Sequence, residues 1–441
     1  MTTEIAIMNK SAVALAADSA VTIRVTGLHG QNHKVLFTAN KLFSLSKYAP
    51  IGLMVYGNAS MLGIPWETIV KMYRERLGDH HFKTLAEHSE DFFDFLDDFD
   101  VDQEVQRAYV ASVAAIWCQE LRRRLDNWVE TELRDGDEGI SLSDVKAFLG
   151  QLIENEYRKC LDAGKKSSFP SGVRSRLRKK YRKTVEDVSK EAFESLPLTR
   201  DMQSKLLTIA INAAVFGLPN QSGIVIAGFG RDELYPYCYD YDVSGVLAGK
   251  SIKKSKQSQR VSHDNAAVVM PFAQSDEVHT FMEGIGPELE QFLRDSFLSI
   301  FSEKLPRTVR DEVATKLGLS DRQKKDLHKI TGDICRGACD GAFRALEQQK
   351  AIRYIAPVIQ ATEFLNKAEL ATMAETLVNL VSFRKQVTME TETVGGPIDV
   401  AIISKGDGLV WIKRKHYFPP ELNHHFFANY YREAGQDAQG K

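Results

Sequence analysis

Residues 2–20, TTEIAIMNKSAVALAADSA, hold two short apolar runs that decide the fold. Residues 5–8 and 12–17 are apolar at every position, and the polar pair Asn9-Lys10 separates them. Short runs that are apolar at consecutive positions indicate strands covered on both faces. A polar pair between two such runs is typical of a tight turn, so this stretch is predicted to form a β-hairpin.

The same reasoning extends along the chain. Further strands are predicted at residues 41–45, 51–56, 224–228, 234–239, 266–270, 398–404 and 408–413. Apolar residues at helical spacing predict helices across most of residues 65–216 and 287–384. The lysine-rich residues 250–260 are predicted to form an exposed basic loop.

Strand-bearing pieces therefore alternate with long helical blocks. The pieces at about residues 1–60, 218–286 and 385–415 are predicted to share one sheet system. The helical blocks are then layers on that core or insertions into it, which is an α+β class of fold.

Composition narrows the class of protein. The 441 residues include 57 Lys+Arg and 59 Asp+Glu, so the net charge of −2 gives no reason to expect nucleic acid or anionic membrane as a partner. No apolar run approaches the roughly 18 residues of a membrane span. Five scattered cysteines and a start without a basic, apolar leader predict a cytoplasmic protein in a reducing compartment.

Four motifs occur in a characteristic order near the N-terminus. They are TTEIAI at residues 2–7, AADS at 16–19, NKLF at 40–43 and YGN at 56–58. Together they resemble proteasome β-type subunits of the N-terminal-nucleophile (Ntn) hydrolases. The stretch VGGPIDV at 394–400 is similar to the glycine turn that enters the closing strand of the bacterial ancestral-β (Anbu) branch. Gly284-Ile285-Gly286 is similar to the family's Gly-Ser-Gly strand end before a helix.

The resemblance implies a four-layer αββα sandwich with large helical insertions. The first part of the Ntn core would span residues 1–61, the second 217–299, and the closing helix and strands 366–416. Helical insertions would occupy 62–216 and 300–365, and residues 417–441 would be a C-terminal tail.

The resemblance also implies a threonine-type hydrolase that cleaves amide bonds, with peptides as the expected substrates. Thr2 would be the nucleophile after removal of Met1, and its own α-amine would be the base. Such an amine has a pKa of about 7.7–8.0, so it can accept a proton near neutrality. Asp18 and Lys41 would be the supporting ion pair, and the N–H of Gly57 would stabilise the oxyanion. This chemistry needs neither a metal nor an organic cofactor.

By the same resemblance, the substrate-binding residues are Val21, Thr22, Val55 and Ala59. The three positions assigned to the specificity pocket are Val21, Val55 and Ala59, all uncharged and small to medium in size. The pocket is therefore predicted to accept an aliphatic or modest aromatic side chain.

Several positions depart from the family pattern. The spacing from Asp18 to Lys41 is longer, and the extra residues are placed at 23–33. Ile285 stands where the family has a supporting serine, and Thr391 and Val394 stand where it has an aspartate and a serine. Glu390 or Glu392 is the candidate replacement for the missing carboxylate.

Two other functions stay open on the same fold. One is a catalytically inactive β-type subunit that acts in assembly or interaction, and the other is a small-amide hydrolase. The partners that the resemblance implies are a peptide or protein substrate, further copies of the chain in a homo-oligomer, and an unfoldase or accessory protein.

The remaining motifs favour ordinary structural roles. His80, His81 and His88 lack a clean metal spacing and are predicted to be solvated, and Cys335 and Cys339 are predicted to be free thiols. The basic residues 174–183 are predicted to form a solvated helix face and not a nucleic-acid site.

Overall fold

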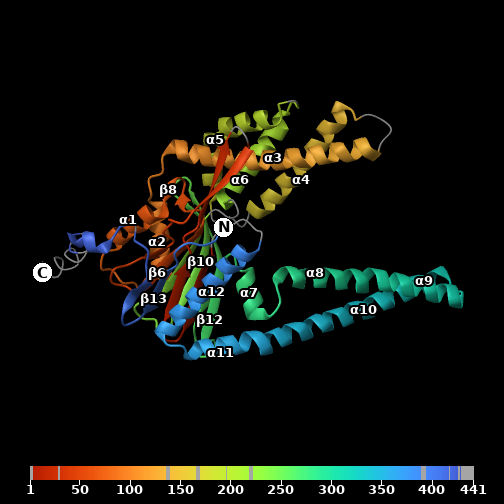
Figure 1. The fold of residues 1–441 in the computed structure, drawn as a ribbon. Coiled ribbons are helices and arrows are strands. Elements are labelled where there is room, and N and C mark those ends of the chain that lie inside the picture. Colours follow the sequence, from red (N-terminus) through yellow and green to blue (C-terminus); the bar gives the residue numbers. More distant parts are fainter. Residues whose placement is uncertain are drawn as a thin grey trace. The chain divides into compact units, whose positions relative to one another are not determined.

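The computed structural model describes residues 3–27, 30–135, 140–164, 169–194, 196–217, 222–388, 394–416, 418–425 and 428. The chain divides into two compact units, Met1–Leu42 with Val261–Lys441 and Phe43–Arg260. Each unit holds helices packed on a five-stranded sheet, so the protein is of the predicted α+β class (Figure 1). The division into the six segments given above stays a prediction.

The first unit is built on the antiparallel sheet β12–β1–β2–β13–β14. Its strands are β1 (Thr3–Asn9), β2 (Val13–Ala17), β12 (Ala267–Ala273), β13 (Asp399–Ser404) and β14 (Gly408–Lys413). β1 and β2 form the predicted hairpin. Asn9 closes the turn, because its side-chain oxygen accepts hydrogen bonds from the N–H groups of Ser11 at 3.0 Å and Ala12 at 3.2 Å.

Helices α7 (Asp276–Glu283), α11 (Ala356–Phe364) and α12 (Lys367–Val387) belong to this unit. Asn366 begins α12, since its side chain and that of Glu369 each accept the other's backbone N–H at 3.0 Å. The apolar face of α12 then packs on one face of the sheet. The buried contacts include Ile5, Ile7, Ala14, Ala16, Leu370, Ala374, Leu377, Val378 and Val381.

The second unit is built on the sheet β11–β10–β9–β6–β5. Its strands are β5 (Leu42–Ser44), β6 (Ile51–Gly57), β9 (Ser222–Gly228), β10 (Tyr237–Val246) and β11 (Ser251–Arg260). The prediction of a basic loop at 250–260 was therefore wrong, because these residues form the edge strand β11. Its side chains from Lys253 onward are exposed, so the sequence shows no apolar alternation that would mark a strand. Lysines on such an edge strand discourage pairing with a further strand.

The predicted helical block of the second unit is confirmed. Helices α1 (Trp66–Leu77) and α2 (Leu85–Asp97) pack on the sheet, and the short ribbon β7 (Ser60–Met61)–β8 (Ile64–Pro65) precedes α1. Helices α3 (Gln103–Asp135), α4 (Leu142–Gly164), α5 (Ser171–Ala192) and α6 (Arg200–Phe216) form two further apolar clusters.

A long helical arm extends from the first unit (Figure 1). Its outgoing half is α8 (Pro287–Leu298), a π-helical segment (Ser299–Lys304) and α9 (Leu305–Leu317). Its returning half is α10 (Asp321–Lys350), which a second π-helical segment (Ala351–Ile355) joins to α11. The arm has little core of its own: α8 has no buried residue, and α10 buries only Gly332, Cys335, Cys339 and Lys350.

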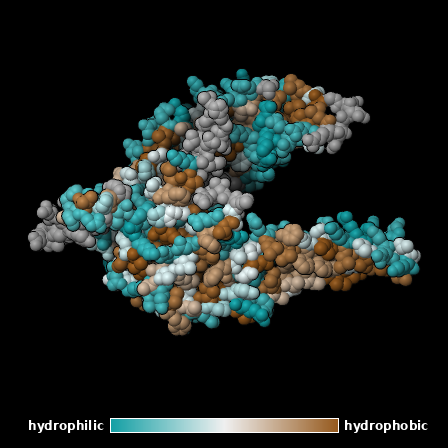
Figure 2. Space-filling model, viewed as in Figure 1, coloured by the Kyte–Doolittle hydropathy of each residue, from teal (hydrophilic) through white to brown (hydrophobic). Residues whose placement is uncertain are grey.

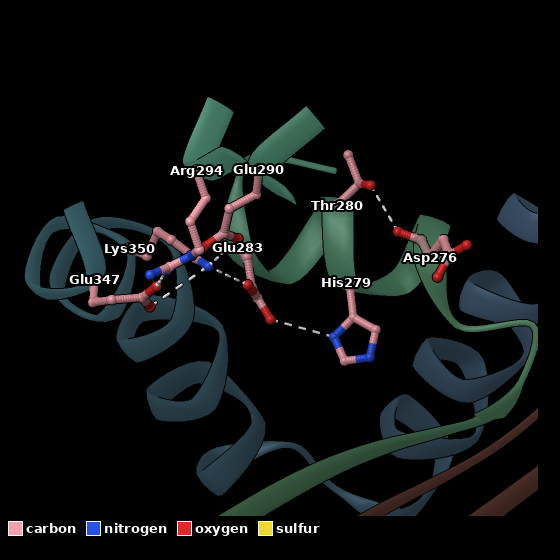
Figure 3. A network of polar contacts seen from close by, with 8 residues as sticks. All are labelled: Asp276, His279, Thr280, Glu283, Glu290, Arg294, Glu347 and Lys350. Carbon is pink, nitrogen blue, oxygen red and sulfur yellow. Dashed lines mark hydrogen bonds and ion pairs between the residues drawn. The ribbon is translucent and has the colours of Figure 1, made fainter. Parts of the chain in front are cut away.

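The Lys350 cluster, which joins α7, α8 and α10, holds the base of the arm (Figure 3). The Lys350 ammonium is 2.6 Å from Glu283 and 2.7 Å from Glu290, and Arg294 is 3.4 Å from Glu347. Burial by itself would lower the pKa of Lys350, but the hydrogen bonds to Glu283 and Glu290 outweigh it and raise that pKa. The cluster thus links the three helices at the start of the arm through one buried ammonium and its partly exposed carboxylate partners.

Two further segments add to or differ from the sequence analysis. The extra residues before Lys41, for which no secondary structure was predicted, lie in a two-stranded ribbon of β3 (Val21–Gly27) and β4 (Gly30–Leu36). The segment 284–286 does not follow a strand: Gly284 ends α7 and Gly286 precedes α8.

Within the described part of the chain, no helix is both long and apolar enough to cross a membrane. All five cysteines are free, as predicted for Cys335 and Cys339.

His88 is fully buried, so the prediction that it is solvated was wrong. Its Nε2 accepts a hydrogen bond from the backbone N–H of Phe82 at 3.1 Å, which requires the neutral ring. Burial, assisted by the nearby His81 and His80, lowers the pKa of His88 to about 3.

We expect this buried ring to make the protein less stable in mild acid. The unfolded chain takes up a proton on His88 below its ordinary pKa of 6.5, whereas the folded chain does not until about 3. Stability contributed by the neutral ring is therefore present above pH 6.5 and is lost as the pH falls. From pH 7 to 5 this ring should lower the free energy of unfolding by about 2 kcal/mol. Urea unfolding of wild type and His88→Gln at both pH values checks this, and an equal pH dependence in the two proteins would contradict it.

Candidate active site

Asp18 is the centre of a buried polar site in the first unit. It directly follows β2 and is fully buried. One carboxylate oxygen accepts the backbone N–H of Thr3 at 3.1 Å, and the other accepts those of Gly395 at 3.0 Å and Ala20 at 3.3 Å. Three backbone donors thus fix the position of this carboxylate.

Lys41 lies beside this carboxylate, as predicted. Its ammonium donates a hydrogen bond to Asp18 and lies 3.4 Å from a carboxylate oxygen of Glu4. The side chain of Lys41 is only 4% exposed and that of Glu4 is fully buried. One buried ammonium is therefore shared between two buried carboxylates on neighbouring segments.

Glu4 is the residue that the sequence analysis missed. A glutamate is almost never fully buried unless it is paired. The sequence could have indicated a paired glutamate here, because Glu4 directly precedes a run predicted to be covered on both faces.

The side chains of β1 point alternately to its two faces, and this places Thr3 on the face away from Lys41. Successive side chains of a strand point to opposite faces. Ile5 and Ile7 pack against α12, so Thr3 shares their face, and Glu4 is on the face of Lys41. The Thr3 hydroxyl is buried and has no hydrogen-bond partner among the described residues.

A glycine turn joins the N-terminal and C-terminal motifs. Gly395 and Gly396 have positive φ angles of 148° and 80°, and the chain then enters β13 as predicted. The N–H of Ser19 donates to the carbonyl of Gly395 at 3.2 Å, while Gly395 donates to Asp18. A Cβ atom on Gly396 would lie 2.8 Å from that of Phe37, so glycine is needed for space as well as for conformation.

The other predicted positions are spread over the chain. Gly57 ends β6 in the second unit with φ of 77°, Val55 is buried beneath α1 and α2, and Ala59 is exposed. Val21 begins β3, half-buried, and Thr22 follows it in that strand. Thr2, Glu390, Thr391 and Glu392 lie outside the described residues.

The supporting positions around the site are altered. Val394 is buried in the apolar cluster under α12, so it offers no polar support. Ile285 lies between two helices. Ser275 precedes α7 and lies two residues after Ala273, which pairs with Thr3.

The described residues hold no group of three or more His, Cys, Asp or Glu side chains placed to bind a metal ion. No protein-family model matches the chain, and no curated protein matches it. Among solved structures, it is similar to an Anbu (Gly-1) mutant from Hyphomicrobium sp. strain MC1. The identity is 10%, the TM-score is 0.28, and the match covers 100% of this chain and 97% of that one. Because this score is too low to establish a common fold, the functional proposal depends on the buried charges around Lys41.

Proposed function

We propose that this protein is a threonine-type N-terminal-nucleophile hydrolase that cleaves amide bonds in peptides. The observation that carries the proposal is the buried Lys41 ammonium, held by Asp18 and Glu4 at the start of β1. Buried charges are costly, and their concentration at one place is typical of a catalytic site.

Strand alternation supports Thr2 as the nucleophile. Successive side chains of a strand point to opposite faces, and Glu4 is on the face of Lys41, so Thr3 points away from Lys41. We therefore propose Thr2, and not Thr3, as the nucleophile.

In the proposed reaction, the Thr2 hydroxyl attacks the carbonyl carbon of the amide while its α-amine takes the hydroxyl proton. The Gly57 N–H stabilises the oxyanion, and the proton passes to the leaving amine as the C–N bond breaks. Water then attacks the resulting ester and releases the acid. Lys41 favours the neutral amine before attack, and the extra carboxylate of Glu4 offsets the positive charge that the amine gains during attack.

Labelling with an electrophilic threonine-directed inhibitor tests the proposal. We expect intact-mass analysis to show one adduct on a chain that lacks Met1, and no adduct on Thr2→Ala. An unlabelled chain that begins at Thr2 would favour the inactive-subunit alternative. Hydrolysis of acylated amines but not of peptides would favour the small-amide hydrolase.

Specificity is a separate proposal. Val21, Val55 and Ala59 carry no charge, and an unpaired charge buried against them would cost several kcal/mol. We expect a peptide library to show aliphatic or modest aromatic residues before the cleaved bond. Dominant cleavage after Arg, Lys, Asp or Glu by the wild type would contradict this assignment.

Partners and place in the cell remain proposals as well. The resemblance favours a cytoplasmic homo-oligomer that receives peptide or unfolded protein, with an unfoldase or accessory protein as a further partner.

A further inference from the structure

The arm carries an apolar ridge that its own helices do not cover. Figure 2 shows apolar side chains gathered along the arm. On α10, Ile330 is 57% exposed and Ile334 is 65% exposed. The buried residues of α10, Gly332, Cys335 and Cys339, lie on the opposite side of the helix by their spacing.

Two glycines continue this ridge. Gly337 and Gly341 follow Ile330 and Ile334 at helical spacing, so the four residues form one stripe, the α10 ridge. A Cβ atom added to either glycine would meet nothing within 4 Å. Glycine is among the least favourable residues inside a helix, and neither position has a positive φ that requires it. The packing of the isolated chain therefore gives no reason for these glycines.

We infer that the α10 ridge binds the α10 ridge of a second copy of this chain, antiparallel and about a two-fold axis. When the axis passes between residues 335 and 336, Ile330 of one copy lies opposite Gly341 of the other. Ile334 then lies opposite Gly337. Each branched side chain meets a position without a side chain, so the ridge is complementary to itself in size, as a two-fold interface requires.

The charges beside the ridge support the same register. On one flank, acidic and basic residues alternate, and all of them are exposed. In the antiparallel pair, a basic residue of the other copy lies at most two positions along the helix from the point directly opposite each acidic residue. These pairs are Asp326 with Arg344, Asp333 with Arg336, and Asp340 with Lys329. The other flank is small or apolar, with Thr331, Ala338 and Ala345, and permits close approach.

This interface does not depend on the proposed hydrolase activity. It is narrow, because it uses one face of one helix, so we expect association in the micromolar range and not an obligate dimer. A foreign partner would not need the match of Ile330 with Gly341 and of Ile334 with Gly337, whereas a second copy supplies both at once.

Sedimentation of the full chain over a micromolar concentration series tests the inference. We expect wild type to associate and the double variant Gly337→Leu with Gly341→Leu to lose this association at least tenfold. The variant should keep its helical circular dichroism, because leucine favours helix more than glycine does. Ile334→Ala should weaken association, whereas the matched truncation Leu317→Ala, at an exposed residue of α9 outside the ridge, should not.

Disulfide trapping tests the register. Ile330→Cys with Gly341→Cys should give a covalent dimer under mild oxidation, because these positions face each other across the axis. Ile330→Cys with Ala345→Cys, one turn out of register, should give much less. Equal cross-linking of both pairs, or equal association of wild type and the leucine variant, would overturn the inference. A wild-type chain that stays monomeric would do the same and would leave the ridge to another partner.

Discussion

Thr2→Ala should abolish hydrolysis, with kcat falling at least about 10⁴-fold, because the proposed reaction has no other nucleophile. The folded state should be unaffected, since loss of one terminal hydroxyl changes the free energy of unfolding by no more than about 0.5 kcal/mol. Peptide hydrolysis by protein whose N-terminus has been sequenced checks this result. Active protein that fully retains Met1 would contradict the proposal, because the α-amine of Thr2 would then be blocked.

Thr3→Val is the matched control for this experiment. The Thr3 hydroxyl is buried on the α12 face of β1 and has no hydrogen-bond partner among the described residues. Replacing it with a methyl group of similar shape should keep activity and leave stability unchanged or slightly higher. If Thr3→Val lost activity and Thr2→Ala kept it, the nucleophile would be assigned to the wrong threonine.

Lys41→Met should remove both activity and stability. Without the ammonium, the buried carboxylates of Asp18 and Glu4 lose the cation that lies beside both of them. Removal of one partner from a buried ion pair costs about 3–5 kcal/mol. Urea unfolding should therefore show a loss of that size, and kcat should fall by orders of magnitude.

A surface variant and a conservative variant separate the loss of activity from the loss of stability. Lys71→Met breaks an exposed pair with Glu67 and should cost at most about 1 kcal/mol with no change in activity. Glu4→Gln should lower the free energy of unfolding less than Lys41→Met does, because Lys41 keeps its ion pair with Asp18. Near-normal activity in Lys41→Met would mean that the motif at residues 40–43 is not catalytic.

Much of the fold follows from the sequence because its signals are local. The hairpin at residues 5–17, the helices within 65–216 and the closing strand pair are marked by apolar periodicity or by turn residues, and the structure confirms all three. The edge strand β11 was missed because its polar sequence lacks the alternation of a half-buried strand. Strand β3, VTIRVTG, does alternate apolar and polar residues, but this stretch was assigned only as extra residues before Lys41.

The candidate site follows from the sequence only in part. The pairing of Asp18 with Lys41 came from a resemblance in residue order, and the structure brings these two side chains together. The assignments of Thr2 and Gly57 stay predictions, because Thr2 lies outside the described residues and Gly57 belongs to the other unit.

The sequence by itself determined the α+β class, the hairpin that begins the chain and the acid–lysine pair beside it. Only the tertiary structure decided that Glu4 shares Lys41 with Asp18, that Gly395 closes the site from the far end of the chain, and that His88 is buried. It also decided that the α10 ridge is left uncovered. The physical reason is that local patterns report which face of an element is apolar, whereas burial and charge pairing depend on what other segments place against that face.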